Sequence, residues 1–352
     1  MLITTRSISW ASLAFVSLCA DAMAAYVLDG ADPSVVWVDG NAFSVQSRNG
    51  GVSIRAGGGT LESLGEAEPR EVWKDKNSLG NIWAPEIVED GERFYIYFSA
   101  GPGDGHRMYV ISSDEPDTGY SDETELKLPD DRWAIDGTLF RYEGELWYVW
   151  SGWSGDANDE QNLYICRMRS PTEPTGARYV ISQPREPWER VVGNPWINEG
   201  PEAIVDPDGQ LHIVYSADGS WSESYCLGDL RLKKGGDPTN VWDWYKSNGC
   251  VMGSNPDQMM EGWDTTTKVN GPGHHTFAIP GGELDGLSTS NTDHPFMFHA
   301  VPKGTEYSWS NREWFSGSFR WVPDVRYSRA NVPGDNENVG WSLMFSEESP
   351  SE

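Results

Sequence analysis

After residue 25, the 352-residue sequence contains no apolar run that approaches the length of a membrane-spanning helix. Helical periodicity is also nearly absent, which argues against a fold built from helices. No Pro- or Ser-rich stretch that resembles a linker divides the chain. We therefore predict one domain with a large core, and no membrane as a partner.

Positive charge is scarce, because 26 Lys and Arg residues stand against 54 Asp and Glu residues. The formal net charge of −28 argues against nucleic acid, anionic membrane surfaces and polyanionic substrates as partners, since each would be repelled. We interpret most of this charge as a solvated surface. The chain beyond residue 25 also lacks an Asn-x-Ser/Thr motif, so N-glycosylation is not expected.

Cysteine is rare, with four residues, of which Cys19 belongs to the N-terminal segment. The other three leave at least one free thiol or an intermolecular link. We predict a disulfide between Cys226 and Cys250, because both fall in one repeat unit and export allows oxidation. Cys166 lies in an apolar, strand-like run and is expected to be a buried thiol.

Residues 1–25 have the pattern of a secretory signal peptide. Arg6 is followed by an apolar stretch over residues 8–20 and by a small-residue site at residues 22–24. The stretch is too short to serve as a membrane anchor. We therefore expect a secreted, extracellular, soluble protein that starts near Ala25 or Tyr26 and is a monomer.

Aromatic residues and turn residues are abundant: 18 Trp, 14 Tyr and 11 Phe accompany 38 Gly and 22 Pro. This composition suits many short strands joined by tight turns, and most of the aromatic side chains are expected to pack between them. Three β-rich runs close on a pair of small residues, at residues 94–100 (FYIYFSA), 146–152 (LWYVWSG) and 211–217 (LHIVYSA). Hairpins repeated in this way indicate propeller blades.

Five repeat units can be recognised along the chain. Three of them run from an acidic residue to a turn glycine, at residues 32–40, 136–144 and 199–209, and residues 296–300 (FMFHA) look like a late copy of the β-rich run. The units begin near Asp32, Trp83, Asp136, Glu199 and His274. We predict an all-β, single-domain, five-bladed β-propeller over residues 26–352.

Acidic residues start three of the units, namely Asp32, Asp136 and Glu199. The innermost strands of a propeller converge on its axis, so residues at equivalent strand starts face one another across the channel mouth. Carboxyl groups so close cannot all ionise without mutual cost, and their pKa values are driven apart. One protonated acid beside one ionised base is what hydrolysis of a glycosidic bond requires. Any one of these acids could have a purely structural role, by capping a turn or pairing with an arginine. Three acids at equivalent positions of the repeats favour a catalytic site instead.

Together the motifs resemble glycoside hydrolase family 43, over roughly residues 28–300. The resemblance rests on five motifs in this order: Asp32-Pro33, residues 83–86 (WAPE), 135–140 (IDGTLF), 198–202 (NEGPE) and 271–275 (GPGHH). Each motif alone is weak, whereas their joint presence is specific. The resemblance implies a five-bladed propeller that cleaves polysaccharides containing arabinose or xylose.

Carried over to the matching positions, the resemblance implies that Asp32 is a general base that activates a water and that Glu199 is the general acid. Asp136 would hold Glu199 in place and raise its pKa. The family inverts the anomeric configuration, which requires acid and base to lie roughly 6.5–9.5 Å apart with room for the water. No cofactor is required for this chemistry.

Further residues are predicted to contact the sugar. Trp83 would form a wall of the pocket and Glu86 a polar support, while Trp153 and Trp221 would frame the cleft from loops at strand ends. Packing within the blades is the alternative for each of the three tryptophans.

His274 begins the fifth unit, and in many members of the family the matching histidine points into the axial channel near a cation, commonly calcium. His274 is therefore a candidate for substrate binding and for a calcium site, with hydrogen bonding to the acids as the alternative. His275 is the second candidate. The sequence itself contains no contiguous EF-hand-like loop. Arg312 and Arg320 are both candidates for the arginine that approaches the acids in the family.

Residues 147–153, 161–164, 186–189 and 198–204 look most similar to exo-acting α-L-arabinofuranosidases within the family. The leading hypothesis is release of terminal α-L-arabinofuranose from plant cell-wall arabinan or arabino-oligosaccharides. The β-xylosidase and endo-arabinanase branches share the same acids and are alternatives. A non-catalytic sugar-binding propeller would be expected to have lost Asp32 or Glu199, and nothing in the sequence favours a protein-interaction propeller.

Overall fold

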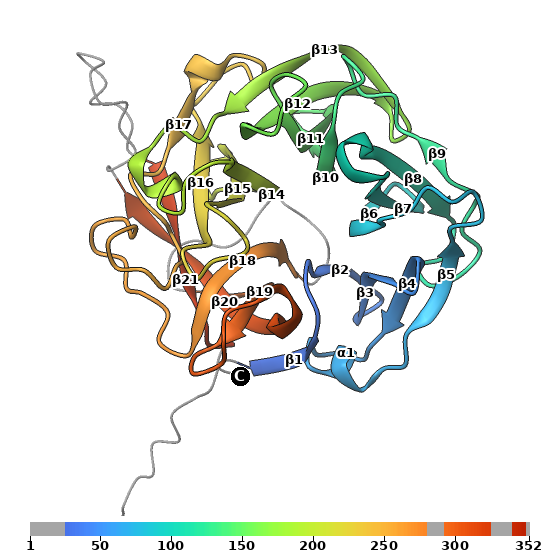
Figure 1. Cartoon of the computed structure of the whole chain (residues 1–352), viewed down its shortest axis with the longest axis horizontal. Coiled ribbons are helices and arrows are strands. Elements are labelled where there is room, and N and C mark those ends of the chain that lie inside the picture. Colours follow the sequence, from blue (N-terminus) through green and yellow to red (C-terminus); the bar gives the residue numbers. More distant parts are fainter. Residues whose placement is uncertain (1–24, 280–291, 325–339, 350–352) are drawn as a thin grey trace, which may run out of the picture.

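The computed structural model describes residues 25–279, 292–324 and 340–349, and these form five β-sheet blades around a central axis (Figure 1). The all-β, five-bladed propeller predicted from the repeats is confirmed. Of the predicted signal peptide, residues 1–24 lie outside the described residues. No helix in the described part of the chain is long and apolar enough to cross a membrane.

Each of the first four blades contains four antiparallel strands in sequence order. Blade 1 contains β2 (Ser34–Val38), β3 (Asn41–Arg48), β4 (Gly51–Ala56) and β5 (Arg70–Lys74), and blade 2 contains β6 (Trp83–Asp90), β7 (Arg93–Ala100), β8 (Arg107–Ser113) and β9 (Thr124–Glu125). Blade 3 contains β10 (Ala134–Tyr142), β11 (Glu145–Trp153), β12 (Glu160–Ser170) and β13 (Glu173–Ser182), and blade 4 contains β14 (Trp196–Val205), β15 (Leu211–Ala217), β16 (Cys226–Leu232) and β17 (Trp244–Lys246).

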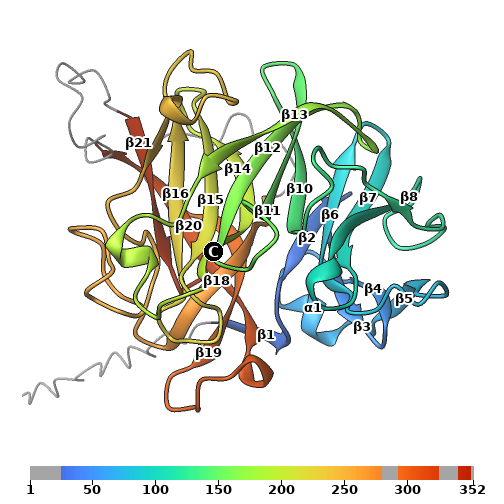
Figure 2. The same ribbon diagram turned by 45° about the horizontal axis from the view of Figure 1, so that its top comes forward.

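The fifth blade closes the ring with strands from both ends of the described chain. It contains β18 (Val269–Phe277), β19 (His294–Pro302), β20 (Glu313–Asp324) and β21 (Gly340–Ser346). Strand β1 (Ala25–Asp29) pairs with the first part of β20, and β21 pairs with the rest of it. Figures 1 and 2 show β1, at the blue end of the chain, lying against this orange-red blade. The two strands cover the outer edge of β20 between them.

Helical structure in the described residues is confined to single turns. They are α1 (Ser63–Glu66) and the 3-10 turns η1 (Gly103–Gly105), η2 (Pro187–Glu189), η3 (Val241–Asp243) and η4 (Trp309–Asn311). The three β-rich runs found in the sequence lie within β7, β11 and β15, as predicted. Two-residue turns such as Asp39-Gly40 and Glu143-Gly144 have positive φ at both positions, which is the type I′ geometry that matches the twist of a hairpin.

Each inner strand is kinked where the chain enters the channel. In β6, β10, β14 and β18, the pairing with the next strand shifts register near the start of the strand. A residue at each of these shifts has a left-handed φ, and in the first blade the corresponding residue lies just before β2. These residues are Asp32 (56°), Ala84 (39°), Asp136 (53°), Gly200 (54°) and His274 (42°). Such bulges redirect side chains at functional sites.

The kinks correct one detail of the sequence alignment. The repeats placed Glu199 in register with Asp32 and Asp136, but the equivalent left-handed position in blade 4 belongs to Gly200. Glu199 precedes it by one residue. The sequence alignment matched the acidic residues of the repeats with one another. It missed the offset of one residue because the equivalent residue, Gly200, has no side chain.

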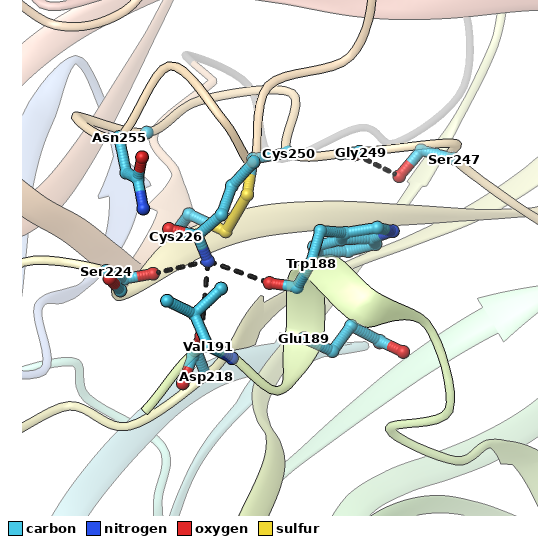
Figure 3. The surroundings of a disulfide bond; sticks show 12 residues. Trp188, Glu189, Val191, Asp218, Ser224, Cys226, Ser247, Gly249, Cys250 and Asn255 are labelled. Atoms are coloured by element: carbon cyan, nitrogen blue, oxygen red, sulfur yellow. Dashed lines mark hydrogen bonds between the residues drawn. A yellow bond between two sulfur atoms is a disulfide. The ribbon is translucent and has the colours of Figure 1, made fainter. Parts of the chain in front are cut away.

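The cysteines lie as the sequence predicted. Cys226 and Cys250 form a disulfide with a Cα–Cα distance of 5.9 Å, at the edge of blade 4 (Figure 3). Cys166 is a free, buried thiol on β12. Most large aromatic side chains fill the blades, and Trp147, Trp150, Trp314 and Trp321 are among those with almost no exposed surface.

Candidate active site

Asp32, Asp136 and His274 converge at the mouth of the axial channel. The Nδ1 atom of His274 lies 3.2 Å from Asp32 Oδ1 and 3.8 Å from Asp136 Oδ2. The three residues are far apart in the sequence, and they meet because they occupy the equivalent kinked positions of blades 1, 3 and 5, respectively. The candidate acid–base cluster therefore follows from the repeat itself.

Asp32 is positioned by groups from blade 5. Its backbone N–H donates to His299 Nδ1 at 3.0 Å, and Arg312 Nη1 lies 3.9 Å from Asp32 Oδ1. Burial opposes ionisation, but contacts with His274, His299 and Arg312 outweigh it and hold the pKa of Asp32 well below its ordinary value. The side chain keeps 24% of its surface exposed, so water can reach this ionised carboxylate.

The structure distinguishes the two arginine candidates. Arg312 lies beside Asp32 and is fixed by a 3.2 Å hydrogen bond from its Nε atom to the carbonyl oxygen of Trp309. Arg320 is exposed on β20, where it contacts Met344 Sδ at 3.8 Å. His299 was absent from the sequence candidates. Its signal was a polar residue within the otherwise apolar run at residues 296–300.

Glu199 reaches the same mouth from blade 4. Its Oε1 atom accepts a 2.8 Å hydrogen bond from the hydroxyl of Tyr225. Burial is the main cause that raises the pKa of Glu199 to about 7, and the charge of Asp32 adds to it, while the hydrogen bond from Tyr225 and the charge of Arg312 lower the pKa. Glu199 is therefore largely protonated in weakly acidic water, whereas Asp32 is ionised.

Asp136 is tied to the backbone beside Glu199. The N–H of Gly200 donates to Asp136 Oδ2 at 3.1 Å. Burial, followed by the neighbouring charges of Glu199 and Asp32, raises the pKa of Asp136 well above its ordinary value. The side chain of Asp136 is only 6% exposed, whereas that of Asp32 is 24% exposed. Water therefore reaches Asp32 more easily than Asp136.

Glu86 lies below the acids, in a polar ring of the channel. Two residues beyond each kink the inner strands carry a polar side chain, at Ser34, Glu86, Thr138, Glu202 and Thr276. The hydroxyl of Thr138 donates to Glu86 Oε1 at 3.4 Å, and Glu86 and Glu202 share a side-chain hydrogen bond. Burial in the channel raises the pKa of Glu86 to about 7. Glu86 and Glu202 also line a cavity of about 700 Å³ at the opposite mouth of the channel.

The tryptophans predicted to contact sugar differ in exposure. Trp83 is 43% exposed and stacks on His106 with ring centroids 3.8 Å apart, and Trp221 is 42% exposed. Each can offer an apolar face to a ligand. Trp153 is 4% exposed and stacks on Trp133 at 4.7 Å, so it has almost no free face.

A further exposed tryptophan was not singled out from the sequence. Trp309, in η4, is 58% exposed, and its Nε1 atom donates to Ser220 Oγ at 3.3 Å. Ser220 precedes Trp221, so the two tryptophans lie on loops that are joined to one another. The carbonyl oxygen of Trp309 also holds Arg312, which connects this pair to Asp32.

The calcium site predicted near His274 was compared with the side chains around it in the described part of the chain. Within residues 25–279, 292–324 and 340–349, no group of three or more His, Cys, Asp or Glu side chains is arranged to hold a metal ion. The Nδ1 atom of His274 faces Asp32 and Asp136, and both ring nitrogens of His275 lack a hydrogen-bond partner while burial lowers its pKa to about 3.

An ionised carboxylate and a protonated carboxyl group lie at one mouth of the channel of this five-bladed propeller. They provide the base and the acid that a glycoside hydrolase requires. The comparison with known proteins agrees. The family model described as glycosyl hydrolases family 43 matches residues 27–327, and the chain belongs to this family.

Relatives within the family carry arabinofuranosidase names. The chain is 30% identical over 253 residues to alpha-L-arabinofuranosidase B of Pyricularia oryzae, covering 68% of this chain and 48% of that one. It is 28% identical over 229 residues to the extracellular exo-alpha-(1->5)-L-arabinofuranosidase of Streptomyces chartreusis, covering 62% of this chain and 66% of that one. The chain thus spans about half to two thirds of these relatives.

Among solved structures, the alpha-L-arabinofuranosidase of Lactobacillus brevis has a similar fold. The TM-score is 0.71 at 26% identity, and the match covers 88% of this chain and 98% of that one. An endo-arabinase of Bacteroides thetaiotaomicron matches with a TM-score of 0.59 at 13% identity, which shows a shared fold and no more.

Proposed function

We propose that this protein is a secreted, inverting exo-α-L-arabinofuranosidase that releases terminal α-L-arabinofuranose from plant cell-wall arabinan or arabino-oligosaccharides. The observation that carries the proposal is the opposite displacement of two pKa values at one channel mouth. The pKa of Asp32 lies below its ordinary range, whereas that of Glu199 is raised to about 7. An ionised base beside a protonated acid is the pair that glycosidic hydrolysis needs.

In the proposed reaction, Asp32 accepts a proton from a water whose oxygen bonds to the anomeric carbon. The bond from that carbon to the glycosidic oxygen breaks, and Glu199 gives its proton to the leaving oxygen. The configuration inverts because the water attacks the face opposite the leaving group. After the products leave, Asp32 loses a proton to solvent and Glu199 regains one, so both residues are restored.

The neighbouring residues have supporting roles in this scheme. His274 and Arg312 keep Asp32 ionised through their contacts with it. Asp136 fixes the backbone after Glu199 through Gly200. Trp83 and Trp221 offer exposed aromatic faces for sugar rings, whereas the buried Trp153 and the channel residue Glu86 act as support behind the site.

Substrate and location are supported by the names of relatives. Arabinofuranosidases from fungi and bacteria match the chain, and the two Streptomyces relatives are named extracellular. The predicted signal peptide agrees with export. The chemistry needs no cofactor, and a calcium ion near His274 is a separate prediction that metal analysis and assay after chelation would test. We also propose that the protein acts as a monomer.

Product analysis tests the assignment. The purified protein is incubated separately with linear α-1,5-arabinan and with β-1,4-xylan, and the products are separated by chromatography. Single arabinose units released from arabinan support the proposal. Xylose alone would move the protein to the β-xylosidase branch, arabino-oligosaccharides would indicate endo action, and an absence of product from both polymers would favour a sugar-binding propeller.

A further inference from the structure

Tyr225 links the proposed acid to the residues that hold the proposed base. Its hydroxyl donates to Glu199 Oε1 at 2.8 Å. Its ring stacks on His299 with centroids 5.7 Å apart and planes 8° from parallel, and His299 in turn accepts the backbone N–H of Asp32. Tyr225 has no exposed surface, so this hydroxyl cannot exchange its partner for bulk water.

The chain on both sides of Tyr225 is held in place. The carbonyl oxygen of Ser224 accepts a 3.0 Å hydrogen bond from Gln258 Nε2, which also donates to the carbonyl oxygen of Trp188. Cys226, the next residue, forms the disulfide with Cys250. Tyr225 therefore lies between two anchor points in the backbone.

A glycine in the fifth blade makes room for the ring. A Cβ atom at Gly273 would lie 2.1 Å from Tyr225 Cε1, which is too close for any side chain. Gly273 belongs to the GPGHH motif and directly precedes His274. The motif thus accommodates Tyr225 as well as supplying the histidine.

We propose that Tyr225 is the positioning residue of the proton donor, and that its hydroxyl determines which oxygen of Glu199 carries the transferable proton. This inference rests on the proposed function, in which Glu199 is the general acid. When Oε1 accepts the hydroxyl hydrogen, it is the carbonyl oxygen of the neutral carboxyl group. The proton is then on Oε2, which is the oxygen left to face the leaving group.

The hydrogen bond persists after proton transfer, when it stabilises the carboxylate. Other charged or titratable groups also face Glu199 or Tyr225, and they come from several blades: Asp32, Asp136, His299, Tyr307 and Arg312. His274 lies against Gly200, the residue after Glu199. A Tyr225→Phe variant removes the hydroxyl alone and keeps the ring on His299 and Gly273. The hydroxyl also shares a hydrogen bond with the side chain of Ser216. Any shift the variant causes is therefore attributable to the hydroxyl and its bonds to Glu199 and Ser216.

The experiment compares Tyr225→Phe with the wild type across pH on two substrates. One is 4-nitrophenyl α-L-arabinofuranoside, whose leaving group needs little protonation, and the other is α-1,5-L-arabinobiose, whose leaving group needs a proton. We expect kcat on the disaccharide to fall about tenfold or more with little change in KM, and kcat on the aryl substrate to fall much less. We also expect the high-pH limb to move to higher pH, because the carboxylate has lost a stabilising donor.

Tyr215→Phe is the matched control. Tyr215 is also fully buried in blade 4, and its hydroxyl donates to Glu189 Oε1 at 2.9 Å, away from the channel mouth. The Tyr215→Phe variant also loses a hydrogen bond from a buried tyrosine to a glutamate. We expect this variant to have lower thermal stability, with the high-pH limb unmoved and with no difference between the kcat changes on the two substrates. Equal losses on both substrates with an unmoved limb in Tyr225→Phe would reduce Tyr225 to a structural residue and overturn the inference.

A second variant covers the case in which Tyr225→Phe folds poorly. Site-specific incorporation of 3-fluorotyrosine at position 225 preserves the shape but makes the phenol a stronger donor, so the high-pH limb should move to lower pH. An unmoved limb overturns the inference. Glu199→Ala separates this outcome from failure of the proposed function, because a variant that keeps full activity on arabinobiose would remove Glu199 as the acid whatever Tyr225 does.

Discussion

The backbone N–H of Gly200 donates a 3.1 Å hydrogen bond to Asp136 Oδ2, so a carboxyl group of blade 3 fixes the residue that follows Glu199 in blade 4. Asp136 has a left-handed backbone, with φ of 53°, and is almost buried. The residue therefore combines a conformational role with a role as an acceptor, and two substitutions can separate them.

Asp136→Asn should be tolerated better than Asp136→Ala. Asparagine accepts a left-handed φ and keeps an oxygen for Gly200, whereas alanine provides neither. We expect Asp136→Ala to lose about 1–3 kcal/mol of unfolding free energy relative to the wild type and more turnover than Asp136→Asn. Thermal melts and kcat on arabinobiose measure both effects. Equal losses of kcat in the two variants would show that the charge of Asp136, and not its bond to Gly200, matters to turnover.

Asp32→Ala and Glu199→Ala should each lower turnover of arabinobiose by about 10²–10⁴-fold with folding intact. Only Glu199→Ala should recover on the 4-nitrophenyl substrate, because that leaving group departs without protonation. Asp90→Ala is the control, since Asp90 pairs with Arg141 at the other end of the inner strand β6. Near-normal turnover in either acid variant would remove its assigned role.

The pH dependence of kcat/KM should be bell-shaped. Glu199 must be protonated, and with its pKa raised to about 7 the rate should fall as pH rises through that value. Asp32 must be ionised, and because its pKa lies below the ordinary range, the low-pH limb should lie below about pH 4 wherever the protein remains folded. A high-pH limb near the ordinary pKa of glutamate would contradict the burial of Glu199.

Glu86 should make stability depend on pH. Burial raises its pKa in the folded protein to about 7 from an ordinary value of 4.5, so folding binds its proton more tightly. This stabilisation is complete below the ordinary pKa and is lost as pH rises through about 7. Glu86→Gln, which cannot ionise, should lose less stability than the wild type between about pH 5 and pH 8. The exposed Glu92→Gln serves as the control, and identical melting curves for Glu86→Gln and wild type would exclude this effect.

Removal of the disulfide should lower stability and weaken catalysis together. The bond closes a loop with a sequence separation of 24, and its loss in a Cys226→Ser/Cys250→Ser variant should cost about 3 kcal/mol of unfolding free energy. Because Cys226 adjoins Tyr225, kcat on arabinobiose should also fall. Cys166→Ser, which removes the buried free thiol of β12, is the control and should leave kcat unchanged. Full activity in the double variant would show that Tyr225 does not need this anchor.

The repeats contained enough information to predict the fold. Strand-forming runs, hairpin turns and unit spacing are local features, so five blades and the disulfide could be derived from them. The repeats also placed Asp32 and Asp136 together at the channel mouth, because residues at equivalent strand starts face one another across the axis. His274 was added by the family resemblance, with hydrogen bonding to the acids as one of its alternatives. The position of Glu199 was displaced by one residue because its equivalent, Gly200, has no side chain.

Other features of the site depend on how blades pack against one another. Tyr225 lies at a place that no repeat motif marks, and His299 lies in a repeated run on another blade that gives no sign of its partners. Their rings nevertheless stack, Tyr225 holds the proposed acid Glu199, and His299 holds the proposed base Asp32. Trp153 and Trp221 look alike in sequence, since both follow a strand end, but one is covered by Trp133 and the other is exposed. Exposure and partner choice of this kind are decided by tertiary packing.

The stereochemistry of the first product tests the central claim most directly. Hydrolysis of α-1,5-L-arabinobiose is followed by proton NMR from the earliest times, before the released arabinose equilibrates between anomers. Attack of a water activated by Asp32 while Glu199 protonates the leaving oxygen predicts that β-L-arabinofuranose appears first. Initial release of the α anomer would mean retention and would contradict the proposed roles of these two carboxyl groups.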